Sequence, residues 1–85
     1  MMYQIKFSRQ ARKSLPKLPN AYQIKVRRVI ASLKFDPYIG KKLEGKYKND
    51  YSIRVWPFRI IYTIMKKELI IEVIEIEHRG RAYKK

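Results

Sequence analysis

The chain has 85 residues, enough for one domain with a hydrophobic core of its own. It contains no cysteine and a single histidine, so disulfides and thiolate metal sites are excluded, and we expect neither a metal nor another cofactor. With 21 Lys and Arg against 7 Asp and Glu, the formal net charge is +14, which favours nucleic acid or a strongly acidic protein as a partner.

The N-terminal residues predict a strand rather than a targeting signal. The opening stretch, MMYQIKF, has no apolar region of signal-peptide length, and no run in the chain approaches the roughly 18 apolar residues of a membrane span. Residues 3–7 alternate between apolar and polar, the pattern of a strand with one buried face. We therefore expect a cytoplasmic protein without a membrane partner.

A short helix is predicted after this strand. Ser8 is a suitable N-cap, and Ala11, Leu15 and Leu18 follow at a spacing that places them on one helical face. Pro16 removes a backbone donor and disfavours the helical conformation of the residue before it. We expect the helix to end or kink there.

A second, longer helix is predicted from residue 21 to about residue 34, with Asn20 as its N-cap. Its apolar residues recur at helical spacing and are Tyr22, Val26, Val29, Ile30 and Leu33. The pair Asp36-Pro37 should stop this helix. Residues 38–50, which include Gly40, Gly45 and several lysines, are predicted to form a loop.

Three runs rich in Ile, Val, Tyr and Phe follow, at Tyr51–Val55, Phe58–Met65 and Leu69–Glu77. Short breaks at residues 56–57 and 66–68 separate them. The pattern predicts a three-stranded antiparallel meander.

An even-length turn in the first hairpin places Arg54 opposite Arg59 on one face of the sheet. The other face is then apolar and should form the core, with Tyr51, Ile53, Val55, Phe58, Ile60 and Tyr62. An even-length second turn adds Ile71 and Val73 to the core face. It places five residues of the last strand on the face of the arginines: Ile70, Glu72, Ile74, Ile76 and His78.

These elements predict an α+β fold in a single domain spanning residues 1–85. An N-terminal strand and a helical hairpin precede the three-stranded antiparallel meander, and the helices pack on one sheet face. The opposite face and the C-terminal tail are left for function.

Several cations are expected to converge at one end of the sheet. Arg54 and Arg59 repel each other at a cost of roughly a few tenths of a kcal/mol when solvated, which a bound anion would offset. The tail adds further polar and charged side chains where the last strand ends: His78, Arg79, Arg81 and Tyr83. A phosphodiester backbone suits such a set, because one guanidinium group can donate two parallel hydrogen bonds to two oxygens of a phosphate.

The order of the elements, with the segments LKFDPYIGKKLEG, YSIRVWPFRIIYTI and IEHRGRAY, resembles the RelE/ParE superfamily of bacterial and archaeal toxins, and its RelE branch more closely. The resemblance covers essentially the whole chain. It implies an mRNA endonuclease that enters the A site of the ribosomal 30S subunit and cuts the bound codon. It also implies neutralisation by an acidic cognate antitoxin similar to RelB.

The resemblance further implies site residues. Those expected to be catalytic are Arg54, Arg59, Arg79, Tyr83 and His78. Apart from the resemblance, the residues expected to contact RNA are Arg81, Ser52, Lys46 and Lys48. Ser52 departs from the family pattern, because some members carry a lysine there, and this leaves one fewer cation for the phosphate.

Metal-free RNA cleavage needs a group that takes the proton of the ribose 2′-OH, cations that hold the phosphorane, and a donor for the leaving 5′-oxygen. We expect Arg59, Arg79 and Arg54 to hold the phosphate. Tyr83 or His78 would move the proton, and the sequence leaves open which is base and which is acid.

Other interpretations stay open. The chain could be a ParE-like inhibitor of DNA gyrase, although the terminal H-R-x-x-x-Y argues against that branch. It could be a basic module that binds nucleic acid without cutting it, or a degenerate member that binds only its antitoxin. The arginines could also be structural and pair with surface carboxylates, for which Glu72, Glu75 and Glu77 are candidates.

Overall fold

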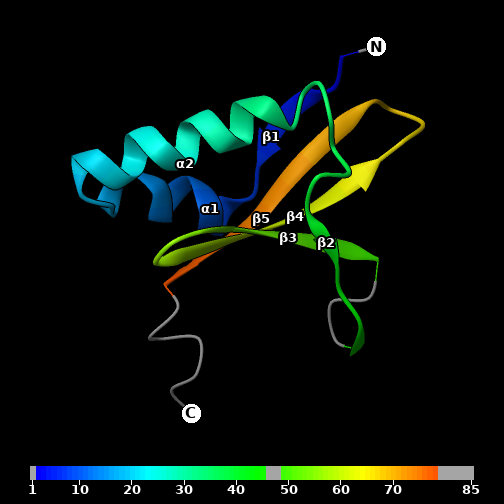
Figure 1. The fold of residues 1–85 in the computed structure, drawn as a ribbon. Coiled ribbons are helices and arrows are strands. Elements are labelled where there is room, and N and C mark those ends of the chain that lie inside the picture. Colours follow the sequence, from blue (N-terminus) through cyan, green and yellow to red (C-terminus); the bar gives the residue numbers. More distant parts are fainter. Residues whose placement is uncertain (1, 46–48, 79–85) are drawn as a thin grey trace.

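The computed structural model describes residues 2–45 and 49–78. In this part of the chain a five-stranded sheet with the strand order β1-β5-β4-β3-β2 carries two helices on one face (Figure 1). The strands are β1 Gln4–Phe7, β2 Lys41–Lys42, β3 Asp50–Val55, β4 Phe58–Met65 and β5 Ile70–His78. The helices are α1 Arg9–Ser14 and α2 Asn20–Ser32. The predicted α+β class, with the helices packed on one sheet face, is confirmed.

Helix α1 begins and ends as predicted. The Ser8 Oγ accepts a hydrogen bond from the backbone N–H of Ala11 (3.1 Å), which satisfies an otherwise unpaired donor of the first turn. The α-helix ends at Ser14, and Leu15–Lys17 form a 3₁₀ turn that contains Pro16. The buried side chain of Ala11 faces the sheet, where α1 contacts β5.

Helix α2 starts one residue earlier than predicted, and the prediction of an Asn20 cap is wrong. Asn20 is the first helical residue, while Pro19 occupies the N-cap position and no side chain caps this end. The Pro19 carbonyl accepts hydrogen bonds from the N–H groups of Tyr22 and Gln23 (both 2.9 Å), which starts the helix without a polar cap. Within the described ranges, neither helix is long and apolar enough to span a membrane.

Two short strands complete the sheet at its edges. β1 pairs in parallel with β5, so the sheet is mixed rather than antiparallel throughout. β2 pairs antiparallel with β3, with Lys41 opposite Ser52 and Lys42 opposite Tyr51. The prediction that residues 38–50 form only a loop is therefore wrong, because a strand of two residues is too short to produce a periodic signal.

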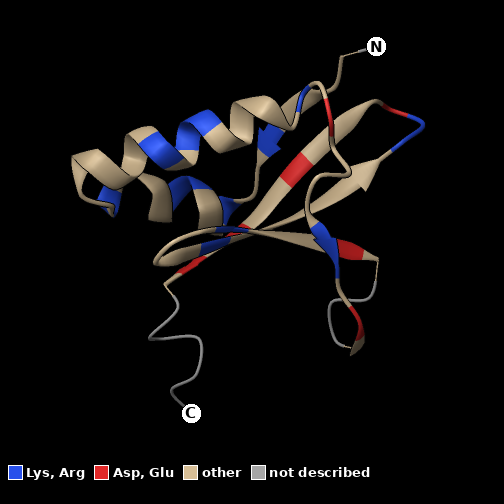
Figure 2. Ribbon diagram, in the orientation of Figure 1, with Lys and Arg blue, Asp and Glu red and all other residues tan. Residues whose placement is uncertain are grey.

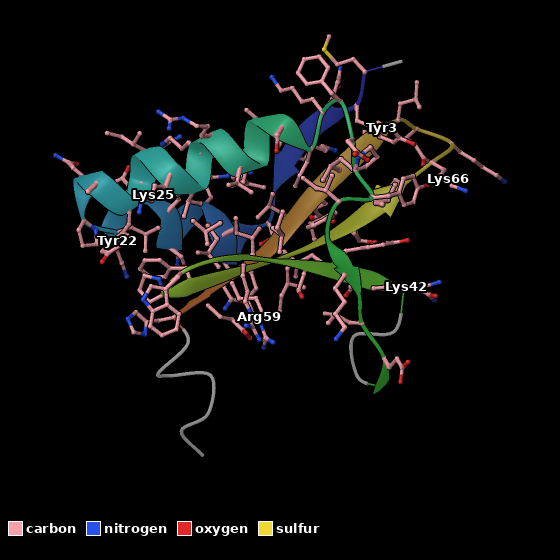
Figure 3. All side chains as sticks on the ribbon, viewed as in Figure 1. Tyr3, Tyr22, Lys25, Lys42, Arg59 and Lys66 are labelled. Atoms are coloured by element: carbon pink, nitrogen blue, oxygen red, sulfur yellow. The ribbon has the colours of Figure 1, made fainter. Side chains whose placement is uncertain are left out.

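The predicted register of the β3–β4 hairpin is confirmed, with Arg54 opposite Arg59 and Val55 opposite Phe58. Side chains from both helices and the central strands fill the space between the helices and the sheet (Figure 3). The buried members of this core are Ala11, Leu15, Val26, Ile30, Leu33, Val55, Phe58, Ile60, Tyr62, Ile71, Val73 and Ile76.

A β-bulge divides β5 into two halves. The pairing with β4 passes from Tyr62 opposite Val73 to Ile61 opposite Glu75, which leaves Ile74 as an extra residue. Because side chains alternate between the two faces of a strand, the extra residue reverses the alternation from there to the end of β5.

This reversal makes the predicted faces of Ile76 and His78 wrong. Ile76 is buried in the core, and the His78 ring packs edge-on against Phe58, with 5.2 Å between the ring centroids. Glu77 lies opposite Arg59 and shares its face instead. The bulge therefore exchanges an imidazole for a carboxylate beside the arginines.

Ser8 holds the bulge in place. Its hydroxyl donates to the carbonyl of Ile74 (2.6 Å), and its backbone N–H donates to the carbonyl of Val73 (2.9 Å). The same oxygen caps α1, so one residue fixes both the helix start and the irregular part of β5. This contact joins residues 66 positions apart in the sequence, and no pattern within β5 reveals it.

Candidate nucleic-acid interface

The sheet face turned away from the helices, here called the outer face, carries the candidate site. Figure 3 shows Arg59 on this side of the sheet and Lys25 on α2 on the other. Cross-strand pairing aligns the outer-face residues in rows. One row consists of Arg54, Arg59 and Glu77, and the next consists of Lys41, Ser52, Ile61 and Glu75.

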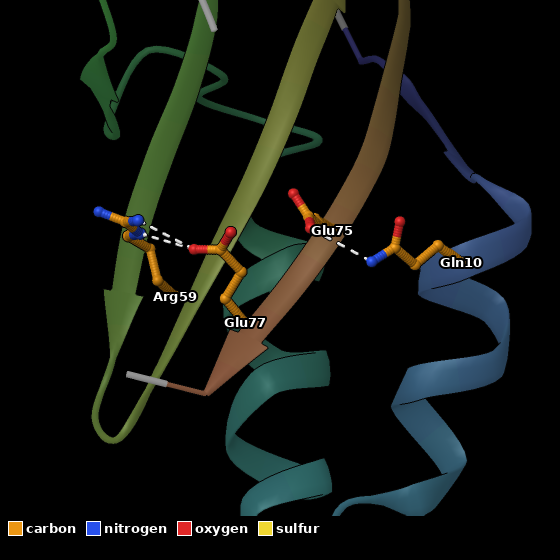
Figure 4. Close-up of polar contacts among 4 residues, drawn as sticks. All are labelled: Gln10, Arg59, Glu75 and Glu77. Carbon is orange, nitrogen blue, oxygen red and sulfur yellow. Dashed lines mark hydrogen bonds and ion pairs between the residues drawn. The ribbon is translucent and has the colours of Figure 1, made fainter. Parts of the chain in front are cut away.

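Arg59 forms an ion pair with Glu77 on the outer face (Figure 4). Its Nη2 and Nε donate to the same carboxylate oxygen, Oε1, at 2.9 Å and 3.3 Å. The two side chains are 32% and 17% exposed, so solvent screens the pair and its net contribution to stability is about 0–1 kcal/mol. The expectation that an arginine of this face pairs with a carboxylate is confirmed for Arg59, and a phosphate can compete for its guanidinium.

A groove with a volume of about 440 Å³ opens on the outer face beside β2 and β3. Its wall and floor include Ile39, Gly40 and Ser52 together with three cations, Lys41, Arg54 and Arg59. No acidic residue is among those that line it in the described part of the chain. Figure 2 shows β2 in the colour of the basic residues. A cationic groove of this kind suits an extended anionic chain.

Tyr62 fastens one wall of the groove from the core side. Its hydroxyl donates to the carbonyl of Pro37 (2.7 Å) and accepts from the N–H of Gly40 (3.1 Å). Its ring is fully buried and stacks on Tyr51, with 5.7 Å between the ring centroids. These contacts hold residues 37–40 against the sheet, at the place where residues 39 and 40 line the groove.

Burial raises the pKa of Tyr62 from 10.0 to about 12. The folded state thus favours the neutral phenol, whose contribution to stability is fully present below pH 10.0 and is lost as the pH rises towards about 12. We expect the free energy of unfolding to fall across this window, and to fall less steeply in Tyr62→Phe. Denaturant titrations at a series of pH values measure both slopes, and equal slopes in the two proteins would contradict the prediction.

Gly40 lies where this wall meets the sheet most closely. A Cβ atom at this position would lie 2.5 Å from the Tyr62 hydroxyl oxygen and 2.8 Å from the carbonyl oxygen of Ser52. Because both distances are below van der Waals contact, we expect Gly40→Ala to lower the free energy of unfolding by about 1–3 kcal/mol. Denaturant unfolding measures the change, with Ile39→Ala at an exposed neighbouring position as the control. Equal stability of Gly40→Ala and the unmodified protein would show that the wall is not held in this way.

The structure brings together part of the predicted site. Arg54, Arg59 and Ser52 line one groove, with Ser52 only 9% exposed in its floor. His78 lies at the end of β5 and packs on the core face instead. The remaining predicted site residues lie outside the described residues: Arg79, Arg81, Tyr83, Lys46 and Lys48.

Two residues of this surface, Lys41 and Glu77, are not among the predicted site residues. Lys41 reaches the groove because β2 pairs with β3. Glu77 reaches Arg59 because the bulge reverses the end of β5. The sequence indicated Glu77 only as one of several carboxylates that could pair with the arginines. Nothing in the sequence singled out Lys41.

Comparisons with known proteins find toxins of toxin–antitoxin systems. Residues 5–83 match the family described as the ParE toxin of the type II toxin–antitoxin system, parDE. An Escherichia coli protein described as a RelE-like toxin is 34% identical in an alignment 85 residues long, gaps included, that covers 96% of this chain and 88% of that protein.

Solved structures of toxin–antitoxin complexes share the fold. A chain of the RelBE2 complex from Mycobacterium tuberculosis has a TM-score of 0.85 and 26% identity, and the match covers 93% of this chain and all 100% of that one. A chain of the archaeal RelE–RelB complex from Pyrococcus horikoshii OT3 has a TM-score of 0.81 and 29% identity, covering 95% of this chain and 99% of that one.

Proposed function

The chain belongs to the ParE toxin family within the RelE/ParE superfamily, and we propose that this toxin of a type II toxin–antitoxin system is an endoribonuclease that cuts mRNA in the ribosomal A site. The observation that carries the proposal is the outer-face groove, where Arg54 and Arg59 lie opposite each other and Lys41 lines the same wall. A guanidinium group can donate two parallel hydrogen bonds to two oxygens of a phosphate, and a cationic groove can bind the backbone of a single-stranded nucleic acid along its length.

The proposed reaction uses only the chain and the RNA. The ribose 2′-oxygen attacks the adjacent phosphorus, the bond from phosphorus to the 5′-oxygen breaks, and the products are a 2′,3′-cyclic phosphate and a 5′-OH end. The phosphorane carries more negative charge than the diester, so cations stabilise it more strongly than the ground state. Arg54, Arg59 and Arg79 would supply these cations, while Tyr83 and His78 are the candidates for proton transfer.

The position of His78 supports a role in orienting an RNA base rather than in proton transfer. Its ring packs against Phe58, whose ring in turn contacts Tyr22 of α2 with 5.4 Å between the centroids. The imidazole is thus part of an aromatic cluster on the helix side of the sheet, whereas Arg59 lies on the outer face. This arrangement favours Tyr83 over His78 as the group that transfers a proton to the leaving 5′-oxygen.

We propose an acidic antitoxin similar to RelB as the protein partner. The two solved structures described above are complexes of RelE-type and RelB-type proteins. Helix α2 presents exposed cations at Lys25, Arg27 and Arg28, seen as blue bands on that helix in Figure 2. An acidic segment that folds along α2 would neutralise part of the net charge of +14. With mRNA on the ribosome as the other partner, the proposed site of action is the cytoplasm.

Inhibition of DNA gyrase is the second candidate, because the matching family is described by its ParE toxins. One preparation of the protein, tested in a gyrase supercoiling assay and on ribosomes with mRNA, separates the two. Cleaved mRNA with unaffected supercoiling supports the nuclease, and the converse supports the gyrase inhibitor. A protein that does neither but binds its antitoxin would be a degenerate member of the family.

A further inference from the structure

Glu77 occupies an unusual place for a carboxylate in a chain with so few of them. It lies in the same row as Arg54 and Arg59, which the groove brings together for a phosphate. The two hydrogen bonds that Arg59 donates to Glu77 both end on Oε1, so the guanidinium fixes the orientation of the carboxylate through one of its two oxygens. The second oxygen, Oε2, has no partner among the described residues, and the side chain is only 17% exposed.

The preceding carboxylate on the same face is arranged differently. Glu75 Oε2 accepts a hydrogen bond from Gln10 Nε2 of α1 at 3.2 Å, so this carboxylate is bonded to a helix side chain (Figure 4). Glu75 also lies in the row of Ser52 rather than that of the arginines. Glu77 is therefore the carboxylate that the described part of the chain places beside the guanidinium pair.

A carboxylate that only braces Arg59 would work against the bound RNA, because its negative charge repels the phosphodiester. This repulsion disappears if the carboxylate takes up a proton during the reaction. Glu77 would then become neutral at the moment when the phosphorane gains charge, and the Arg59 guanidinium would transfer its hydrogen bonds from Glu77 to the phosphorane. Such a change stabilises the transition state more than the ground state, which is the requirement for catalysis.

We propose that Glu77 is the general base that takes the proton from the ribose 2′-OH, an inference that rests on the proposed nuclease function. The proton passes from the 2′-OH to Oε2, the 2′-oxygen forms a bond to phosphorus, and the bond to the 5′-oxygen breaks. The 5′-oxygen takes a proton from a general acid. After the 2′,3′-cyclic phosphate has left, Glu77 gives its proton to water and the acid takes a proton from water, so both groups return to their starting protonation states.

Glu77→Gln tests the assignment, because the amide has the same shape and its oxygen still accepts from Arg59. Cleavage of ribosome-bound mRNA should fall by about 10²–10⁴-fold, the usual contribution of a general base. Binding of an mRNA with a 2′-deoxynucleotide at the cleaved position, which cannot react, should be unchanged or tighter, because a negative charge has been removed. Glu75→Gln, the matched control two residues earlier on the same face, should cleave as the unmodified protein does.

A second variant separates chemistry from folding. Glu77→Ala should lose cleavage to a similar extent, and added formate should restore part of it by supplying a carboxylate in the space left by the side chain. Cleavage by Glu77→Gln within about twofold of the unmodified protein would overturn the assignment and leave Glu77 a structural partner of Arg59. Faster cleavage by Glu77→Gln would also overturn the assignment, and would indicate that the ion pair with Glu77 keeps Arg59 from binding the RNA. Failure of the unmodified protein to cut any mRNA is a different result, since it rejects the nuclease function and the general base together.

Discussion

Arg59→Ala is expected to lower the rate of mRNA cleavage by about 10²–10³-fold, because it removes a cation that we propose contacts the phosphorane. Arg59 lines the groove, and its partner Glu77 is held at 2.9 Å on the same face. The guanidinium is therefore fixed before RNA arrives and loses little conformational freedom on binding. Single-turnover cleavage on ribosomes with a defined codon in the A site measures the effect.

The control for Arg59→Ala is Arg27→Ala, which removes the same charge from the exposed surface of α2 on the other side of the sheet. It should change cleavage by less than about threefold if the effect at Arg59 is local rather than a consequence of net charge. The cleavage rate of Arg59→Lys should lie between the rates of Arg59→Ala and Arg27→Ala, because lysine keeps the charge but cannot donate two parallel hydrogen bonds. Equal losses in Arg59→Ala and Arg27→Ala would contradict a specific phosphate contact at Arg59.

Tyr83→Phe is expected to lower cleavage by about 10²–10⁴-fold, since it removes the hydroxyl proposed to protonate the leaving 5′-oxygen. The substitution deletes one oxygen and keeps an aromatic ring that can still stack on a base. Tyr38→Phe, at an exposed tyrosine elsewhere on the chain, is the control and should leave the rate unchanged.

A substrate with sulfur in place of the 5′-oxygen sharpens this prediction. A thiolate leaves without being protonated, so the defect of Tyr83→Phe should become much smaller on this substrate. The defect of Glu77→Gln should persist, because the 2′-OH still has to lose its proton. A Tyr83→Phe defect that is as large with sulfur as with oxygen would show that Tyr83 is not the acid.

The sequence was sufficient where local patterns decide the structure. An even-length turn at residues 56–57, together with the alternation along β3, predicted the hairpin register and the facing pair Arg54 and Arg59. Ser8 was predicted to cap the start of α1 and Pro16 to end it, each from local chemistry alone, and both predictions are confirmed. Two of the groove residues followed from these local rules.

The sequence was insufficient where contacts between distant segments decide. Ser8 holds the bulge at Ile74 from the opposite end of the chain, and the bulge determines that Glu77 rather than His78 faces Arg59. Lys41 reaches the groove through a strand that exists only because β3 is beside it. These two contacts place a lysine and a carboxylate, rather than the imidazole of His78, on the outer face with Arg54 and Arg59.

The central claim is tested most directly by incubating the purified protein with one mRNA, once naked and once on ribosomes with a defined codon in an empty A site, and mapping the new ends. The nuclease account predicts cleavage within that codon on ribosomes alone, with a 2′,3′-cyclic phosphate on one product and a 5′-OH on the other. Intact mRNA in both reactions, from a protein that inhibits DNA gyrase in the supercoiling assay, would contradict it.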